Sequence, residues 1–405
     1  MEDKEEADYL NNILKTSDKY LRQIFNPGEL TQFLDELRDG KEQTREEIIE
    51  RFIRTYEEYI KRKYQREENP NFSQALFNFM NNDNRRIKIY WGNVYDFLKD
   101  LPAESIHLMV TSPPYYNARE YSQWENLHEY LKDMKKIIEQ CYRVLDNHHV
   151  FVFNIGDIFD NDNLTVKSVW GDRRLPLGSY LIKIFEDVGF TFVDDYIWDK
   201  GEVQSERHKN GSTPYPFYQY PMNAYEHILI FHKHRLDKTR FPCPDCGSLK
   251  VSGNTQSEIG LQSWECKNYD CTNRSQGNRG KRFSLKTNLT QNSKKREGNE
   301  IPEELIKKWR KDIIPFSPVI KINSKGENKL GHTAPFPEDI PEMAVRFFSY
   351  KGDIVLDPFA GSFTSAIVAN RLGRIGVGCE IRRDLFEESI KNNITNKGQE
   401  YEEFN

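Results

Sequence analysis

A tetrapeptide that could bind an amine follows the apolar run Ile106–Val110, and it consists of Ser112, Pro113, Pro114 and Tyr115. Two consecutive prolines fix two φ angles and have no N–H donors, so the Ser112 and Pro113 carbonyls form a rigid set of acceptors. An amine conjugated to an aromatic ring is a poor nucleophile. Acceptors that bind both of its hydrogens as the nitrogen becomes tetrahedral stabilise the transition state more than the ground state. The Ser112 hydroxyl and the Pro113 carbonyl are the candidate acceptors, and Tyr115 is the candidate stacking residue. By itself the motif is equally typical of a stiff loop.

A second turn that could bind a ligand follows the apolar run Ile354–Leu356. Its residues are Asp357, Pro358, Phe359, Ala360 and Gly361. Gly361 removes a side chain where the backbone approaches a ligand, and Glu380, 19 residues later, is placed to accept hydrogen bonds from two ribose hydroxyls. Phe363 stands where a second glycine would wrap a pyrophosphate, which favours a nucleotide-like ligand without phosphate. An ordinary strand-to-helix turn of another α/β enzyme is the alternative.

Alternating strands and helices are needed to bring these two turns together. Short apolar runs predict strands at residues 87–91, 106–110, 150–155, 191–198, 227–232, 353–357 and 376–380. Amphipathic periodicity predicts helices at residues 127–145, 180–188 and 364–372. This alternation predicts an α/β domain with a largely parallel sheet, in which both turns end strands.

Residues 236–330 interrupt the alternation because Gly, Asn, Ser, Lys and Arg dominate them. We therefore predict four parts: an N-terminal helical extension (1–80), a first half of the α/β domain that carries the tetrapeptide (81–235), an inserted module (236–330) and a second, cofactor-binding half (331–405). In the extension, apolar residues recur every three or four positions between residues 48 and 64. We interpret this stripe as a face that docks on the main domain.

Four of the six cysteines fall within 29 residues of the predicted insert, namely Cys243, Cys246, Cys266 and Cys271. Two pairs of thiolates with such short internal spacings are typical of a tetrahedral structural zinc site in a zinc ribbon. Metal binding would let a small polar segment fold without a large core, and four thiolates leave no open position for catalysis. Unliganded thiols are the alternative. We interpret Cys141 and Cys379 as core thiols.

Charge is distributed unevenly although the formal net charge is only −5. Residues 1–80 contain 13 Lys and Arg against 18 Asp and Glu, whereas residues 232–330 contain 21 against 11. The basic segment predicts contacts with nucleic acid, and its candidate residues are Arg274, Arg279, Lys281, Arg282, Lys286, Lys294, Lys295 and Arg296. No run approaches the roughly 20 apolar residues of a membrane span, and the N-terminus is acidic, so we expect a cytoplasmic protein with no membrane partner.

These motifs as a set resemble the S-adenosylmethionine-dependent DNA amino-methyltransferases of bacterial restriction-modification systems, in the motif order called class beta. In that order the catalytic motif comes first, the target-recognition region follows and the cofactor motif comes last. The resemblance covers Ile89–Arg382 apart from most of the insert. It implies a Rossmann-like class I methyltransferase fold with permuted motifs, whose seven-stranded, mostly parallel sheet has one antiparallel strand. It also implies in-line methyl transfer to an amine of a base flipped out of double-stranded DNA.

The resemblance implies further site residues. Residues 89–93 look like the motif that approaches the cofactor adenine, which points to Asn93, although Asp is commoner there. Residues 331–337 look like the cofactor motif that precedes Asp357, and residues 223–233 are similar to the motif that shapes the base pocket. The implied cofactor-binding residues are Asn93, Thr333, Phe336, Asp357, Pro358, Phe359, Gly361 and Glu380. The implied catalytic residues are Ser112, Pro113, Pro114 and Tyr115.

The predicted base depends on Ser112. Family members that methylate adenine usually carry Asp or Asn before the double proline, whereas Ser is usual for cytosine, and residues 119–121 also resemble the cytosine type. We therefore predict a cytosine-N4 methyltransferase, with adenine N6 as the alternative because a hydroxyl can accept a hydrogen from either amine. An RNA substrate and a non-catalytic zinc-ribbon DNA-binding protein are further alternatives. Whether a cognate restriction endonuclease is a partner, and the oligomeric state, are left open.

Overall fold

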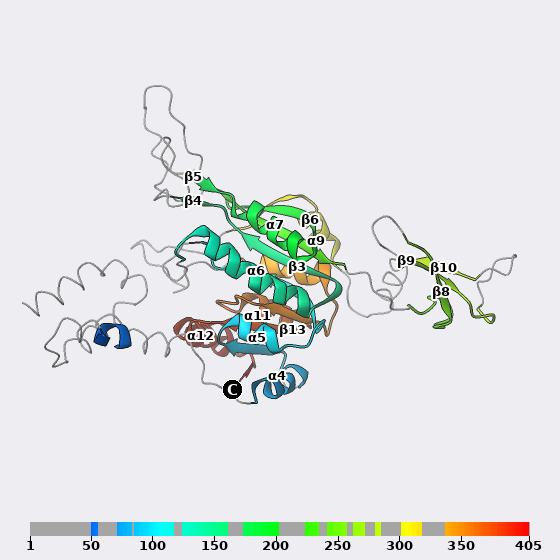
Figure 1. The fold of residues 1–405 in the computed structure, drawn as a ribbon, viewed down its shortest axis with the longest axis horizontal. Coiled ribbons are helices and arrows are strands. Elements are labelled where there is room, and N and C mark those ends of the chain that lie inside the picture. Colours follow the sequence, from blue (N-terminus) through cyan, green and yellow to red (C-terminus); the bar gives the residue numbers. More distant parts are fainter. Residues whose placement is uncertain are drawn as a thin grey trace, which may run out of the picture.

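A nine-stranded sheet forms the centre of the computed structural model, which describes residues 50–55, 71–82, 85–116, 124–160, 173–201, 223–234, 241–256, 262–271, 280–284, 301–317 and 337–404. The strand order is β11-β6-β7-β3-β2-β12-β13-β1-β14 (Figure 1). The seven central strands are β1 (Ile87–Trp91), β2 (Ile106–Thr111), β3 (Leu145–Ile155), β6 (Phe190–Asp199), β7 (Tyr225–Lys233), β12 (Ile354–Asp357) and β13 (Ile375–Glu380). The edge strands are β11 (Ile313–Pro315) and β14 (Glu402–Glu403).

Strand direction agrees with the sequence prediction, but strand number does not. β7 runs antiparallel to both of its neighbours, β3 and β6, and the other pairs of this sheet are parallel. A mostly parallel sheet with one antiparallel strand is therefore confirmed. The expected seven strands become nine because β11 and β14 add a strand at each edge. Both are too short to produce an apolar run that a sequence pattern could reveal.

The two halves of the α/β domain share this sheet. β12, from the last part of the chain, pairs in parallel with β2, from the first part, with Val355 opposite Leu108. Parallel neighbours end at the same edge of a sheet, so the turns after β2 and β12 lie on the same side. Whether the motif order is that of class beta stays a prediction from the resemblance.

Helices cover both faces of the sheet. On one face, visible in front of the strands in Figure 1, lie α5 (Val94–Asp100), α6 (Leu127–Val144) and α7 (Leu177–Val188). On the other face lie α9 (Glu303–Trp309), α10 (Asp339–Phe348), α11 (Thr364–Arg371) and α12 (Arg383–Ser389), which the short turns η1 (Ile390–Ile394) and η2 (Thr395–Lys397) extend. Buried side chains of β2 divide between the faces: Met109 joins the first core, whereas Leu108 and Val110 join the second. The domain is thus a three-layer sandwich.

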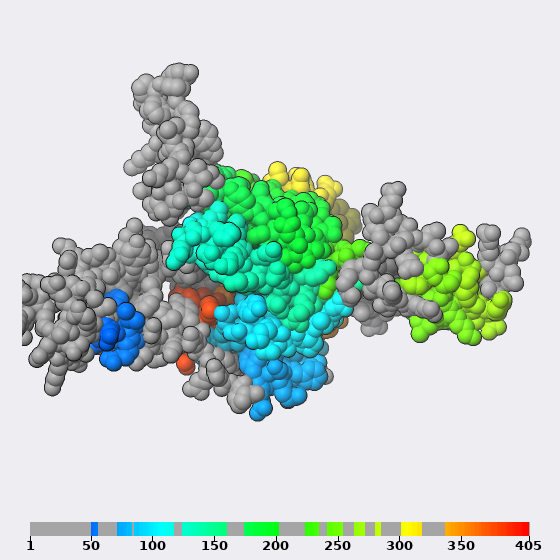
Figure 2. Space-filling model, viewed as in Figure 1, coloured from blue at the N-terminus to red at the C-terminus, as the bar shows by residue number. Residues whose placement is uncertain are grey.

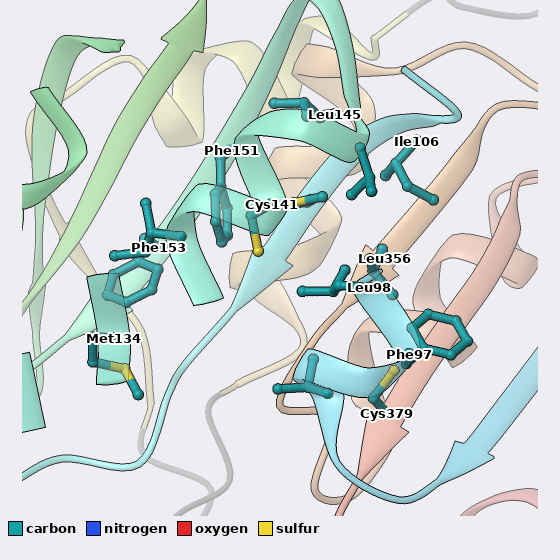
Figure 3. Close-up of a cluster of buried hydrophobic side chains, with 14 of the residues drawn as sticks. Phe97, Leu98, Ile106, Met134, Cys141, Leu145, Phe151, Phe153, Leu356 and Cys379 are labelled. Atoms are coloured by element: carbon teal, nitrogen blue, oxygen red, sulfur yellow. The ribbon is translucent and has the colours of Figure 1, made fainter. Parts of the chain in front are cut away.

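The core thiols predicted from the sequence are buried in the first of these cores. Cys141 and Cys379 are each 1% exposed. Figure 3 shows both among apolar side chains such as Phe97 and Phe151. The prediction that these two cysteines are core thiols is therefore confirmed.

The C-terminal segment packs against α4 (Phe72–Asn81) on this domain. This helix lies beside α5, as the blue and cyan surfaces in Figure 2 show. Phe404, only 3% exposed, packs edge-on against Phe72 and Phe79 of α4. Residues 50–55 are helical, and the rest of the predicted apolar stripe lies outside the described residues.

The predicted insert contributes to two different structures. β8 (Val251–Gln256), β9 (Gln262–Cys266) and β10 (Arg282–Ser284) form a separate antiparallel sheet. In contrast, β11 pairs with β6, and Trp309 and Ile314 are buried in the core of the large sheet. The large sheet therefore takes up residues 301–317, although the sequence predicts them as part of the insert.

A third, two-stranded sheet lies directly after β3. Its antiparallel strands are β4 (Ile158–Asp160) and β5 (Arg173–Leu175). Among the described residues, no helix has the length and apolar character that a membrane span requires.

Candidate functional site

The acceptor-rich turn and the cofactor turn are joined at the carboxyl edge of the sheet. Ser112 to Tyr115 follow β2, and Asp357 ends the adjacent strand β12. The Thr111 hydroxyl donates a hydrogen bond of 2.5 Å to Asp357 Oδ1, across 246 residues of sequence. The structure thus brings together the two turns that the sequence singles out, and Thr111 is a contact that the sequence did not reveal.

Asp357 holds the cofactor turn from inside the protein. It is 1% exposed, and besides Thr111 it accepts hydrogen bonds from the Phe359 backbone N–H (3.1 Å) and the Ser365 hydroxyl (2.7 Å). Burial raises the pKa of Asp357 to about 6, although these hydrogen bonds oppose the shift. Three of the roughly four acceptor sites of the carboxylate are therefore used within the protein. The geometry favours an anchoring role, and direct contact with a cofactor stays a prediction.

Glu380 has the geometry expected of a carboxylate that binds a ribose. Its Oε2 accepts a hydrogen bond from the Gly361 backbone N–H (3.1 Å), and its Oε1 accepts one from the Arg382 backbone N–H (2.8 Å). An ionised carboxylate offers about four acceptor sites, so one remains on each oxygen, which suits two vicinal hydroxyls. Burial raises the pKa of Glu380 to about 7, since these donors only partly replace water.

Asn93 lies at the same edge of the sheet. The Gly92 backbone N–H donates to the Glu380 carbonyl at 2.9 Å, which holds the end of β1 against the end of β13. The side-chain oxygen of Asn93, however, accepts from the Tyr95 backbone N–H at 2.8 Å and caps α5. Its position is compatible with the predicted cofactor contact, while its observed role is to begin a helix.

The remaining predicted cofactor residues are only partly described. Pro358 is buried and Phe359 is half-buried, so these residues shape the turn. Gly361 has a φ of 49°, a left-handed conformation that favours glycine. Thr333 and Phe336 lie outside the described residues.

Three polar side chains from different strand ends meet behind Ser112. Ser112 Oγ lies 3.3 Å from the Tyr115 hydroxyl, which in turn donates to Glu226 Oε2 at 2.8 Å. Lys200 Nζ donates to Glu226 Oε1, also at 2.8 Å. The Glu226 and Lys200 side chains are 14% and 17% exposed, so solvent screens this ion pair only weakly. The sequence predicts stacking for Tyr115 but neither charged partner. The resemblance at residues 223–233 is the signal that could have identified Glu226.

His227, the next residue on β7, lies between two carboxylates. Its Nδ1 is 2.8 Å from Asp195 Oδ2, and its Nε2 is 3.8 Å from Asp157 Oδ1. Burial lowers the pKa of His227, but hydrogen bonds and charges from Asp157 and Asp195 outweigh burial and raise the pKa to about 9. A Cβ at Gly178 would lie 2.8 Å from the imidazole, so glycine there leaves room for the ring. An imidazolium therefore links β7 to β6 and to Asp157, which follows β3.

The four clustered cysteines converge on one point in the small sheet. Their sulfur atoms all lie within 4.8 Å of one another. Sγ of Cys243 is 3.9 Å from Sγ of Cys271, and Sγ of Cys246 is 3.7 Å from Sγ of Cys266. Four sulfurs at about 2.3 Å from a tetrahedral zinc ion would lie about 3.8 Å apart, whereas disulfide sulfurs lie about 2.05 Å apart. The donor set therefore fits a zinc ion and excludes disulfides in this conformation.

The backbone of the first cysteine pair has the form of a metal-binding knuckle. The Gly247 N–H donates to the Cys243 carbonyl at 2.8 Å, and Gly247 has a φ of 69°.

Of the basic residues predicted to contact nucleic acid, the structure describes Lys281 and Arg282. Lys281 Nζ lies 3.4 Å from a carboxylate oxygen of Asp245, and Arg282 Nε lies 3.9 Å from one of Glu265. The others lie outside the described residues.

Comparison with known proteins relates this chain to a family of DNA methylases. A family model described as DNA methylase matches residues 106–391. The Type II beta methyltransferase M.BslI from Bacillus sp. (strain NEB-606) is 42% identical over 327 residues, which are 80% of this chain and 29% of that protein. The chain thus spans less than a third of the length of this relative.

Similar solved structures share less sequence. A protein described as a DNA modification methylase from Thermus thermophilus, complexed with S-adenosyl-L-methionine, is 21% identical with a TM-score of 0.49, covering 78% of this chain and 98% of that chain. PvuII DNA methyltransferase (cytosine-N4-specific) is 19% identical with a TM-score of 0.46, covering 76% of this chain and 88% of that chain.

Proposed function

Because the chain belongs to the DNA methylase family, we propose that it transfers a methyl group from S-adenosylmethionine to the N4 amine of cytosine in double-stranded DNA. The observation that carries the proposal is the Thr111–Asp357 hydrogen bond, which joins the amine-binding turn to the turn in front of Glu380. A methyl donor held by the second turn would therefore be close to an amine held by the first. The name of the relative M.BslI supports a restriction-modification context.

Different residues at this edge of the sheet bind the cofactor and the base. Glu380 binds the ribose of S-adenosylmethionine, which supplies an electrophilic methyl group when bound. Ser112 Oγ and the Pro113 carbonyl accept the two amine hydrogens, and Tyr115 stacks on a base that has left the duplex. This binding strengthens as the nitrogen becomes tetrahedral, so it lowers the barrier to transfer.

Cytosine is proposed because Ser112 precedes the double proline, and Ser at that position is usual in the family members that methylate cytosine. Adenine N6 is the alternative, since the matching family is named for both amines. Methylation of genomic DNA by the purified protein, followed by mass spectrometry of the nucleosides, separates the two. N4-methylcytosine is the expected product; N6-methyladenine overturns the base assignment, and no methylated base overturns the enzyme.

Ser112→Ala tests the acceptor directly. We expect methyl transfer to fall by about 10²- to 10³-fold, the typical effect of removing one group that stabilises developing charge. Binding of S-adenosylmethionine, measured by calorimetry, stays unchanged because Glu380 is not affected. Full activity in Ser112→Ala would show that another group accepts the amine hydrogen.

We also propose that Cys243, Cys246, Cys266 and Cys271 bind a structural zinc ion, and that the small sheet contributes to target recognition. The sulfur distances support the ion, and the basic composition of the sequence segment 274–296 supports contact with DNA phosphates.

A further inference from the structure

A continuous series of hydrogen bonds leads from the proposed amine acceptor to an ion pair. It runs from Ser112 Oγ to the Tyr115 hydroxyl (3.3 Å), from Tyr115 to Glu226 Oε2 (2.8 Å), and from Glu226 Oε1 to Lys200 Nζ (2.8 Å). Three strand ends contribute to it, those of β2, β6 and β7. Gly156 lies against its centre, because a Cβ there would be 3.1 Å from both Glu226 Cγ and Tyr115 Cε2.

The direction of each hydrogen bond follows from proton counting. Lys200 holds Glu226 as an ionised carboxylate, which can only accept. The single proton of the Tyr115 hydroxyl is therefore donated to Glu226. In the contact between Ser112 and Tyr115, the donor must then be Ser112. Its hydroxyl proton is directed away from the base, and its lone pairs are left to accept a hydrogen from the amine.

The surroundings keep this direction fixed. Burial raises the pKa of Tyr115 well above its ordinary value, and the charge of Glu226 raises it further, so the phenol keeps its proton. Lys200 is held in place by its own backbone N–H, which donates to the Ala224 carbonyl at 2.8 Å.

We propose that Glu226 and Lys200 are positioning residues that make Ser112 an acceptor, and that Glu226 receives the proton released by methylation. The proposal rests on the function proposed above. In the step, the amine nitrogen forms a bond to the methyl carbon while the carbon–sulfur bond breaks, and the electron pair stays on sulfur as a neutral thioether.

Proton movement balances this step. One amine proton passes to Ser112 Oγ, the Ser112 proton passes to Tyr115, and the Tyr115 proton passes to Glu226. The positive charge of the sulfonium and the negative charge of the carboxylate both disappear, so the total charge of the site is unchanged. Ser112 and Tyr115 end the step with one proton each, as they began it.

Tyr115→Phe is the most informative variant because it keeps the ring and removes only the relay. We expect the single-turnover rate of methyl transfer to fall by about 10²-fold at saturating DNA and S-adenosylmethionine, the lower limit for loss of proton transfer by a positioned group. KM for DNA should stay unchanged, since stacking is retained. Tyr142→Phe, in which the altered α6 ring packs on Phe190 of β6, is the matched control and should keep the wild-type rate.

Glu226→Gln tests the direction of the hydrogen bonds. With its amide oxygen facing Lys200, the glutamine would present N–H to Tyr115 and reverse the Ser112–Tyr115 bond. We expect a rate loss at least as large as in Tyr115→Phe, with cofactor binding unchanged. Loss of the ion pair with Lys200 lowers the melting temperature, so the rate is measured well below it. A solvent deuterium isotope effect on the wild-type rate should be absent from both variants.

The outcomes separate this inference from the proposed function. A wild-type enzyme that methylates DNA, with Tyr115→Phe or Glu226→Gln at the same rate, overturns the relay alone. Variants that only raise the KM for DNA, with an unchanged rate at saturation, also overturn the relay, because Tyr115 and Glu226 would then act in binding. A wild-type protein that methylates no base overturns the function and the relay together.

Discussion

The nine-stranded sheet and the small three-stranded sheet differ in the role of their cysteines. In the large sheet, Cys141 and Cys379 lie in an apolar core, where burial raises the pKa of both thiols and keeps them protonated. In the small sheet, four cysteines point at one another, and among the described residues only Val251, Trp264, Phe283 and Phe241 add apolar side chains to their cluster. Apolar burial is thus sufficient to stabilise the large sheet. The small sheet buries too little apolar surface, so its fold should depend on bonds from sulfur to a metal ion.

The largest expected effect is therefore loss of the metal. Removing zinc with a chelator, or the change Cys243→Ser, should unfold the small sheet, since structural zinc contributes on the order of 10 kcal/mol to such folds. Zinc release, measured with a colorimetric dye, should coincide with rapid hydrogen exchange in residues 241–284 and with unchanged exchange in the large sheet. Cys141→Ala is the control and should retain zinc. A purified protein that contains no zinc and still protects residues 241–284 would remove the distinction between the two regions.

The second test concerns a buried carboxyl group in the large sheet, that of Glu380 at the end of β13. Its pKa is raised from 4.5 to about 7 in the cofactor-free protein, so the protonated form favours folding. This contribution is complete below about pH 4.5 and is lost as the pH rises through about 7, at roughly 1.4 kcal/mol per pKa unit and about 3 kcal/mol in all.

Urea unfolding of Glu380→Gln measures this contribution. Because glutamine stays neutral, the variant should match the wild type near pH 5 and be more stable than it near pH 8, while binding S-adenosylmethionine less tightly. Glu139→Gln, at an exposed position of α6, is the control and should show no such pH-dependent difference. Equal effects of pH on the wild type and Glu380→Gln would mean that Glu380 is ionised in the free protein at no cost.

The sequence predicts the large sheet far better than the small one, and the reason is physical. Buried parallel strands are continuous apolar runs, so β1 and β2 could be located to within a residue. β10 is three residues long and gains stability only from its neighbours, so no local pattern marks it. The same limit applies to the site: Ser112 and Glu380 stand at recognisable strand ends, whereas Glu226 meets Tyr115 across 111 residues through the folded sheet alone.

Two glycines allow each region to be disturbed separately. A Cβ at Gly376 would lie 2.2 Å from the Ala366 carbonyl oxygen, so Gly376→Ala must push α11 away from β13. A Cβ at Gly280 would lie 1.6 Å from the Cys266 carbonyl oxygen in the small sheet. Each change should cost about 1–3 kcal/mol in its own region.

The two glycine variants are controls for each other. Calorimetry should show a lower melting temperature of the large domain in Gly376→Ala alone, and a zinc competition assay should show weaker binding in Gly280→Ala alone. If either variant weakens both properties, the two regions fold as one unit, and the separate roles of apolar burial and metal binding would no longer hold.

The smallest expected effect concerns the thiols themselves. Cys141→Ala removes one buried sulfur from a core that keeps all of its other apolar contacts, so it should cost only about 1 kcal/mol. The same burial keeps the thiols of Cys141 and Cys379 from forming thiolates, which are the reactive species. A thiol reagent should therefore modify four cysteines once the metal is chelated, and the last two only when urea unfolds the large sheet. Modification of all six on chelation would show that the core of the large sheet opens with the small one, because a reagent can reach Cys379 only if that core opens.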